Sequence, residues 1–122
     1  MAKKKRIHTT VDYAIQGAQE KKGKQIVKLD LRNTSNSVTN HFVICHGTSK
    51  PHIEAIADSV LEFVKKHTGE IPKYKEGYAN AEWILIDYFD VVIHIFQETT
   101  RRFYKLENLW ADAEIQHIES DD

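Results

Sequence analysis

The chain has 122 residues, of which 41% are hydrophobic, 10% aromatic and 29% charged. This length and composition predict one globular domain, residues 1–122, and exclude collagen-like, low-complexity and wholly disordered classes. No apolar run is long enough for a membrane-spanning helix, and no apolar stretch follows the basic start as it would in a secretory signal. The single cysteine, Cys45, cannot form an internal disulfide. We therefore expect a protein of a reducing compartment, most simply the cytoplasm.

The net charge is −1, but charge is unevenly distributed. Residues 1–32 hold nine Lys or Arg against three Asp or Glu, and residues 106–122 hold six acids and no Lys or Arg. The near-neutral total argues against wholesale wrapping in nucleic acid. We expect a loose basic arm at 1–7 and a partly ordered acidic tail at 111–122. The basic end either contacts RNA phosphate locally or, with the tail, is simply solvated.

Helical and strand patterns alternate along the first half of the chain. Thr9 or Thr10 caps a helix whose apolar face is Val11, Ala14, Ile15 and Ala18, and Gly23 ends it. Residues 25–31 form a strand, 32–40 a polar loop and 41–46 a short buried strand. Ser49 caps a second helix, which has Pro51 in its first turn and ends at Gly69. Residues 71–76 are a short strand. A strand, this helix and a further strand form a βαβ unit, so part of the sheet is expected to be parallel.

Residues 82–88 and 91–97 are two strands joined at Phe89-Asp90. A two-residue loop pairs Trp83 with Phe96, Leu85 with His94 and Asp87 with Val92, so these six side chains share one face. The opposite face is almost purely apolar and must belong to the core: Ile84, Ile86, Tyr88, Val91, Ile93 and Ile95. The first face, with its Trp, Asp and His, is where a functional site is expected.

A last helix is predicted from Thr99 or Thr100 to Trp110. Its expected inner stripe is Phe103, Leu106 and Trp110. Its expected outer face carries Arg101, Tyr104, Lys105 and Asn108. The predicted fold class is therefore α/β, with a mixed sheet of about five strands flanked by helices.

The candidate chemical groups are few. Asp87, Asp90 and His94 form a carboxylate–imidazole cluster, but Asp90 lies in the turn and points elsewhere. Two groups make a pair and not a metal site, so the favoured interpretation is Asp87 orienting a half-buried His94. Cys45, within an apolar strand, is expected to be a buried hydrophobe. No metal, cofactor or catalytic residue is therefore predicted.

Other histidines and the first tryptophan give weaker signals. His41, His46 and His52 lie close in sequence but fit no metal-ligand spacing on one element. No nucleotide-binding, zinc-protease or serine-hydrolase motif occurs. On pattern alone, Trp83 is equally compatible with a core position and with a protein-binding surface, which Arg101, Tyr104 and Lys105 could extend.

Residues 25–110 resemble the ribosomal silencing factor (Iojap) family in a series of blocks that keep their order and spacing. The blocks are Val27-Lys28-Leu29-Asp30, Phe42-Val43-Ile44-Cys45 with Gly47-Thr48-Ser49, Ile56-Ala57-Asp58, Glu76-Gly77, Trp83-Ile84-Leu85-Ile86-Asp87, Asp90-Val91-Val92-Ile93-His94-Ile95-Phe96 and Arg101-Arg102-Phe103-Tyr104-Lys105-Leu106-Glu107-Asn108-Leu109-Trp110.

The resemblance implies an α/β domain with nucleotidyltransferase-like topology but without the catalytic motif. It also implies a translation repressor that is not an enzyme. Such a protein binds the large ribosomal subunit through ribosomal protein fourteen and sterically blocks joining of the small subunit when nutrients are scarce. The implied partner-binding residues are Trp83, Asp87, His94, Arg101 and Tyr104. An exposed apolar face favours a homodimer when the protein is free.

The chain departs from the family pattern at three places. Asn40-His41 stands where Asp-Tyr is usual, His46 replaces a small hydroxyl residue, and Phe89 replaces a Gly in the hairpin turn. The Phe89 change is sterically demanding, because Gly tolerates positive φ and Phe does not. Two other hypotheses remain open at this point: a nucleotide- and metal-dependent nucleotidyltransferase-like enzyme using Asp87, Asp90 and His94, and an RNA-binding module using the basic N-terminal segment.

Overall fold

A computed structural model describes residues 9–34, 39–109 and 112–118. The predicted basic arm, 1–7, lies outside these residues. The elements follow the chain as α1 (Thr10–Glu20), β1 (Lys24–Asp30), β2 (His41–Gly47), α2 (Lys50–Thr68), β3 (Tyr74–Glu76), β4 (Trp83–Asp87), β5 (Val91–Gln97), α3 (Glu98–Tyr104), α4 (Leu106–Leu109) and β6 (Glu114–His117). The strands form one six-stranded sheet in the order β3-β4-β5-β2-β1-β6. This confirms the α/β class.

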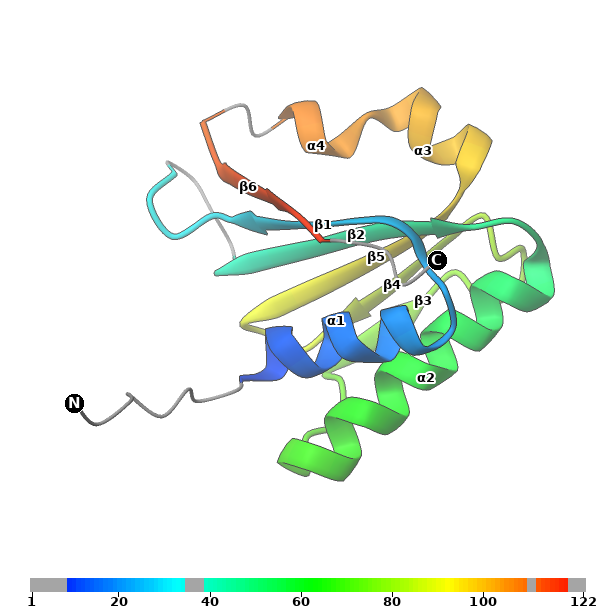
Figure 1. Cartoon of the computed structure of the whole chain (residues 1–122), viewed down its shortest axis with the longest axis horizontal. Coiled ribbons are helices and arrows are strands. Elements are labelled where there is room, and N and C mark those ends of the chain that lie inside the picture. The colour runs from blue at the N-terminus through cyan, green and yellow to red at the C-terminus, as the bar shows by residue number, and fades with distance from the viewer. Residues whose placement is uncertain (1–8, 35–38, 110–111, 119–122) are drawn as a thin grey trace.

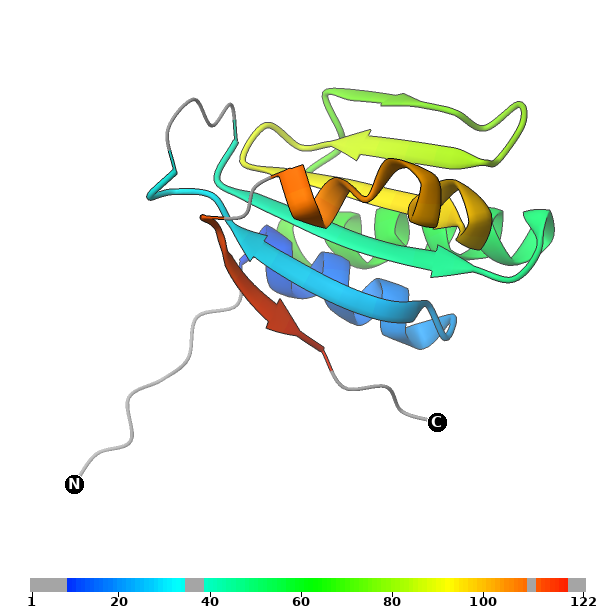
Figure 2. The same ribbon diagram turned by 90° about the horizontal axis from the view of Figure 1, so that it is seen from above.

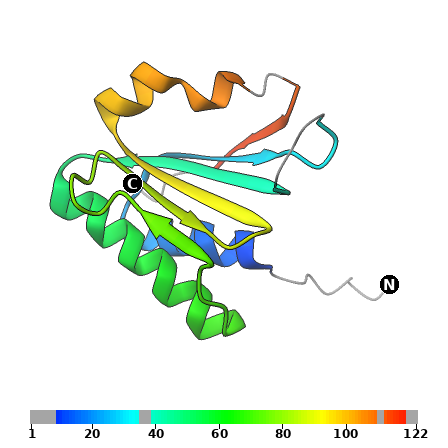
Figure 3. The same ribbon diagram turned by 180° about the vertical axis from the view of Figure 1, so that it is seen from behind.

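The helices lie on both faces of the sheet. Helices α1 and α2 pack side by side beneath it, and α3 and α4 lie above it (Figure 1; seen from behind in Figure 3). From above, α3 and α4 cross the middle of the sheet and leave its two edges uncovered (Figure 2). No helix among the described residues is long and apolar enough to cross a membrane.

The predicted start of α1 and both predicted ends of α2 are confirmed, whereas α1 ends at Glu20, with Lys21 as its C-cap, and not at Gly23. Thr9 is the N-cap of α1, and its backbone N–H donates to the Asp12 carboxylate at 2.9 Å. Ser49 caps α2 by accepting a hydrogen bond from the His52 backbone N–H at 3.2 Å. Gly69 ends α2 in the left-handed conformation, with φ of 80°.

The sheet is mixed, as predicted. Strands β2 and β5 pair in parallel, whereas the β1–β2, β1–β6, β3–β4 and β4–β5 pairs are antiparallel. The chain between the two parallel strands includes β3 and β4 as well as α2. The β4–β5 register is the predicted one, with Trp83 opposite Phe96, Leu85 opposite His94 and Asp87 opposite Val92.

Two apolar clusters lie on the two faces of the sheet. The face predicted to be core is buried at every position and packs with the apolar stripes of α1 and α2. The cluster on the other face includes Phe42, Ile44, Phe96 and Leu106, with Trp83 partly buried against it. The second face is therefore only partly closed by α3 and α4.

The C-terminal predictions need three corrections. The expected helix 99–110 is two helices, because Lys105 adopts a left-handed φ of 48° between α3 and α4. Phe103, predicted to point inward, is 79% exposed, whereas Leu106 is buried as expected. Trp110 lies outside the described residues. Within the predicted acidic tail, residues 114–117 form the edge strand β6, which pairs with β1 and makes the sheet one strand larger than expected.

Candidate partner-binding surface

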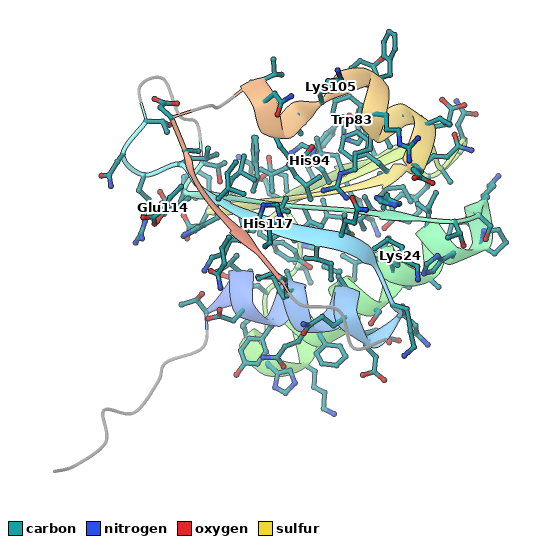
Figure 4. The ribbon with its side chains drawn as sticks, turned by 45° about the horizontal axis from the view of Figure 1, so that its top comes forward. Lys24, Trp83, His94, Lys105, Glu114 and His117 are labelled. Atoms are coloured by element: carbon teal, nitrogen blue, oxygen red, sulfur yellow. The ribbon has the colours of Figure 1, made fainter. Side chains whose placement is uncertain are left out.

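Trp83 is the centre of an aromatic group between the sheet and α3. Its ring lies 4.8 Å from that of Phe96 and 5.0 Å from that of Tyr104, centroid to centroid. Its indole Nε1–H donates a hydrogen bond to Nδ1 of His94 at 3.0 Å. Figure 4 shows Trp83 and His94 on the sheet face that α3 and α4 cover. Trp83 thus combines a partly exposed ring with a fixed polar end.

His94 lies beneath Trp83 and is only 4% exposed. Its ring and that of Phe42 pack in a T-shaped arrangement, with 4.6 Å between the centroids. Burial lowers the pKa of His94 to about 3, so the imidazole is neutral near pH 7. Because Nδ1 accepts from Trp83, the ring proton lies on Nε2, which is buried and has no partner among the described residues.

The predicted pairing of Asp87 with His94 is wrong, because the only N–H that His94 could donate to a carboxylate, Nε2–H, has no partner among the described residues. Asp87 instead accepts a hydrogen bond from the backbone N–H of Phe89 at 2.7 Å, at the start of the β4–β5 turn. Phe89 has φ of 80° there, so the carboxylate supports a sterically demanding turn. Asp87 remains partly exposed at the end of β4, and its carboxylate forms no other hydrogen bond or ion pair with the described part of the chain.

Arg101 is not on the outer face of the last helix, as predicted, but is buried, with 6% of its surface exposed. Its guanidinium donates to Nδ1 of His46 and to Oε2 of Glu107, each at 2.9 Å, and to the Lys24 carbonyl at 3.3 Å. The left-handed turn at Lys105 precedes Glu107, which folds back to Arg101. Burial, and then the charge of Arg101, lowers the pKa of His46. Arg101 therefore fastens α3 and α4 to the sheet.

The aromatic surface consists of Trp83, Leu85, Phe103 and Tyr104. Tyr104 is 49% exposed and contacts Phe103 edge-on at 5.1 Å between centroids. Leu85 lies two residues from Trp83 on the same face of β4 and is also partly exposed. Phe103 and Leu85 were not among the predicted site residues. The alternation along β4 could have indicated Leu85, whereas Phe103 was expected on the inner face of one continuous helix, which the structure divides at Lys105.

The three residues of the enzyme hypothesis, Asp87, Asp90 and His94, do not form one site in the structure. Asp87 bonds the turn, Asp90 is exposed within the turn, and His94 is buried below Trp83. Cys45 is fully buried, and burial raises the pKa of its thiol to about 12. In residues 9–34, 39–109 and 112–118, no three His, Cys, Asp or Glu side chains are grouped so that they could hold a metal ion.

The fold and this surface define an α/β protein with an accessible aromatic face next to a buried imidazole. A profile of the family described as "Ribosomal silencing factor during starvation" matches residues 4–122. The chain is 39% identical to the ribosomal silencing factor of Halalkalibacterium halodurans over 106 residues, covering 87% of this chain and 89% of that protein. The corresponding Bacillus subtilis protein is 34% identical over 106 residues, covering 87% and 88%.

A solved structure from Chromobacterium violaceum matches with a TM-score of 0.79 and 30% identity, and covers 88% of each chain. The sequence matches and the structural match each cover most of this chain. The chain belongs to the ribosomal silencing factor family.

Proposed function

We propose that this protein represses translation by binding the large ribosomal subunit and blocking its joining to the small subunit. Family membership supports the proposal, since the matching curated bacterial proteins are named ribosomal silencing factors. The contact would be made in the cytoplasm with ribosomal protein fourteen, when nutrients are scarce. The mechanism is steric exclusion. It makes and breaks no bond, so it requires neither a metal nor a cofactor.

The observation that carries the choice of site is the exposed aromatic surface on a rigid sheet. Trp and Tyr are enriched where binding energy concentrates, because they bury a large area at little cost in conformational entropy. Trp83 packs against Phe96 and Tyr104 and is only partly buried. Phe103 and Tyr104 extend the apolar area onto α3. This surface is the proposed contact with the ribosomal protein.

Charge at the end of β4 would orient the contact. Asp87 uses one carboxylate oxygen for the Phe89 N–H and is partly exposed. A basic group of the partner could pair with this carboxylate and favour one orientation of docking. Of the five predicted contact residues, Trp83, Asp87 and Tyr104 are accessible, whereas His94 and Arg101 act from inside the fold.

The test is a titration of labelled large subunits with the wild-type protein and two matched variants. Trp83→Ala should weaken binding by about 2 kcal/mol or more, roughly 30-fold, because it removes the proposed anchor. Ile115→Ala is the control, since Ile115 is an exposed apolar residue on β6, at the far edge of the sheet. Circular dichroism establishes that both variants are folded. Equal affinities for all three proteins would place the contact elsewhere.

The same titration with isolated ribosomal protein fourteen tests the partner itself. We expect saturable binding that Trp83→Ala weakens by the same factor as it weakens binding to the subunit. Binding to the subunit without binding to the isolated protein would contradict this part of the proposal.

A further inference from the structure

The indole N–H of Trp83 forms its hydrogen bond within the protein. An indole has one hydrogen-bond donor, Nε1–H, and no acceptor. In this protein that donor is occupied by Nδ1 of His94 at 3.0 Å. The Trp83 side chain therefore has no free hydrogen-bond donor to offer a partner, although an indole could in principle offer both a ring and a donor.

The acceptor that holds the indole is itself fixed. His94 is in the middle of β5, paired with Leu85 on β4 and with Ile44 on β2. Its ring is 4% exposed and contacts Phe42 on the side away from β4. Neighbouring strands thus confine the imidazole on both sides, so Nδ1 keeps a constant position below the indole.

The geometry leads us to propose that His94 is a positioning residue, which fixes the Trp83 indole for partner binding. It follows that the partner receives Trp83 in an apolar recess and provides no hydrogen-bond acceptor for Nε1–H. The part of this inference that concerns partner binding rests on the proposed function. A ring that is already oriented loses less rotational freedom on binding than a free one, so the fixed geometry increases affinity.

Two substitutions separate the hydrogen bond from the bulk of the side chain. In His94→Asn, the side-chain oxygen can take the place of Nδ1 as an acceptor, whereas His94→Leu keeps an apolar side chain of similar reach and removes the acceptor. The variants are made in a Trp110→Phe background. Since the chain has two Trp residues, Trp83 is then the only indole.

The first readout is the indole N–H resonance in a ¹H–¹⁵N spectrum of the free protein. We expect His94→Leu to move the Trp83 proton upfield and to speed its exchange with solvent, because the hydrogen bond is lost. His94→Asn should stay closer to the parent in both properties. An indole resonance that His94→Leu leaves unmoved would overturn the inference, since the hydrogen bond would not exist in solution.

The second readout is affinity for the large subunit. We expect His94→Leu to bind about tenfold more weakly than the parent and His94→Asn to recover most of this loss. The comparison is repeated in Trp83→Phe, which has no indole N–H. There the Leu and Asn variants should bind equally. The same difference between Leu and Asn in both backgrounds, or no difference in either, would show that His94 does not act through the indole.

These readouts distinguish failure of this inference from failure of the proposed function. If the parent protein does not bind the large subunit, the proposed function is wrong. The part of the inference that concerns partner binding is then overturned as well. The resonance of the free protein still decides whether His94 positions the indole.

Discussion

At the scale of single residues, the β4–β5 turn holds a phenylalanine in a conformation that suits glycine. Phe89 has φ of 80°, is 66% exposed, and lies under the Lys73 ammonium at 4.9 Å. We expect Phe89→Gly to be more stable than Phe89→Ala by about 1 kcal/mol, because both remove the ring and only Gly relieves the left-handed strain. Urea unfolding of the two variants measures the difference. Greater stability of the Ala variant would contradict the strained geometry.

Gly77 packs directly against the backbone of Trp83. Its φ is 95°, and a Cβ atom there would lie 2.0 Å from the Trp83 carbonyl oxygen. Gly69 also has positive φ, 80°, but a Cβ there would meet nothing within 4 Å. Gly77→Ala should therefore cost about 2 kcal/mol more than Gly69→Ala, because only Gly77→Ala displaces β4.

Chemical denaturation of the Gly77→Ala and Gly69→Ala variants measures this difference. Binding to the large subunit should fall for Gly77→Ala and stay unchanged for Gly69→Ala. Equal losses of stability at the two positions would mean that Gly77 does not approach Trp83 closely.

At the scale of elements, the two helices below the sheet meet at a glycine. A Cβ on Gly17 in α1 would lie 2.8 Å from the Cα of Val60 in α2, and the Ser59 hydroxyl donates to the Gly17 carbonyl at 2.7 Å. Gly17→Ala should destabilise the protein by about 1–3 kcal/mol, since the overpacking outweighs the better helix propensity of Ala. Gln16→Ala, one position earlier on α1, serves as the control. Thermal unfolding that shows a more stable Gly17→Ala variant would contradict this packing.

Elements with strong periodicity were predictable from the sequence. The apolar stripes of α1 and α2, their N-caps and the β4–β5 register follow from local spacing, and the structure confirms them. The register placed Trp83 on the same face as His94. It did not reveal the hydrogen bond between them, because opposing strands fix the face of a side chain but not its rotamer.

The C-terminal region was predicted less well, for physical reasons. Nothing in the residue type of Lys105 indicates a left-handed conformation, and the break there changes which side chains of α3 and α4 point inward. Phe103, which was expected to be buried, is exposed, and Arg101, which was expected to be exposed, is buried. Strand β6 has all four residues exposed, so it lacks the alternation of buried and exposed side chains that identifies a strand.

At the scale of the whole molecule, buried neutral histidines make stability depend on pH. Burial lowers the pKa of His41, His46 and His94, the last to about 3. At these three residues the unfolded chain takes up protons near pH 6.5, whereas the folded protein takes them up only at lower pH. The unfolded state therefore binds more protons below this pH, and stability falls as the pH decreases from about 6.5 toward 4.

Urea unfolding between pH 7.5 and pH 4.5 measures this dependence, above the range in which carboxylates contribute most. His94→Asn should reduce the slope around pH 5 by about one proton, or roughly 1.4 kcal/mol per pH unit, because the titrating group is gone. An unchanged slope in this variant would mean that His94 is protonated in the folded protein.

We propose that this protein, through Trp83, occupies the large ribosomal subunit and prevents subunit joining. The most direct test is sucrose-gradient co-sedimentation of the purified protein with separated large and small subunits, with wild type and Trp83→Ala in parallel. We expect the wild type to co-migrate with the large subunit alone and to reduce the number of joined ribosomes, and we expect the variant to lose both effects. Wild-type protein that stays at the top of the gradient while joining proceeds unchanged would contradict this proposal.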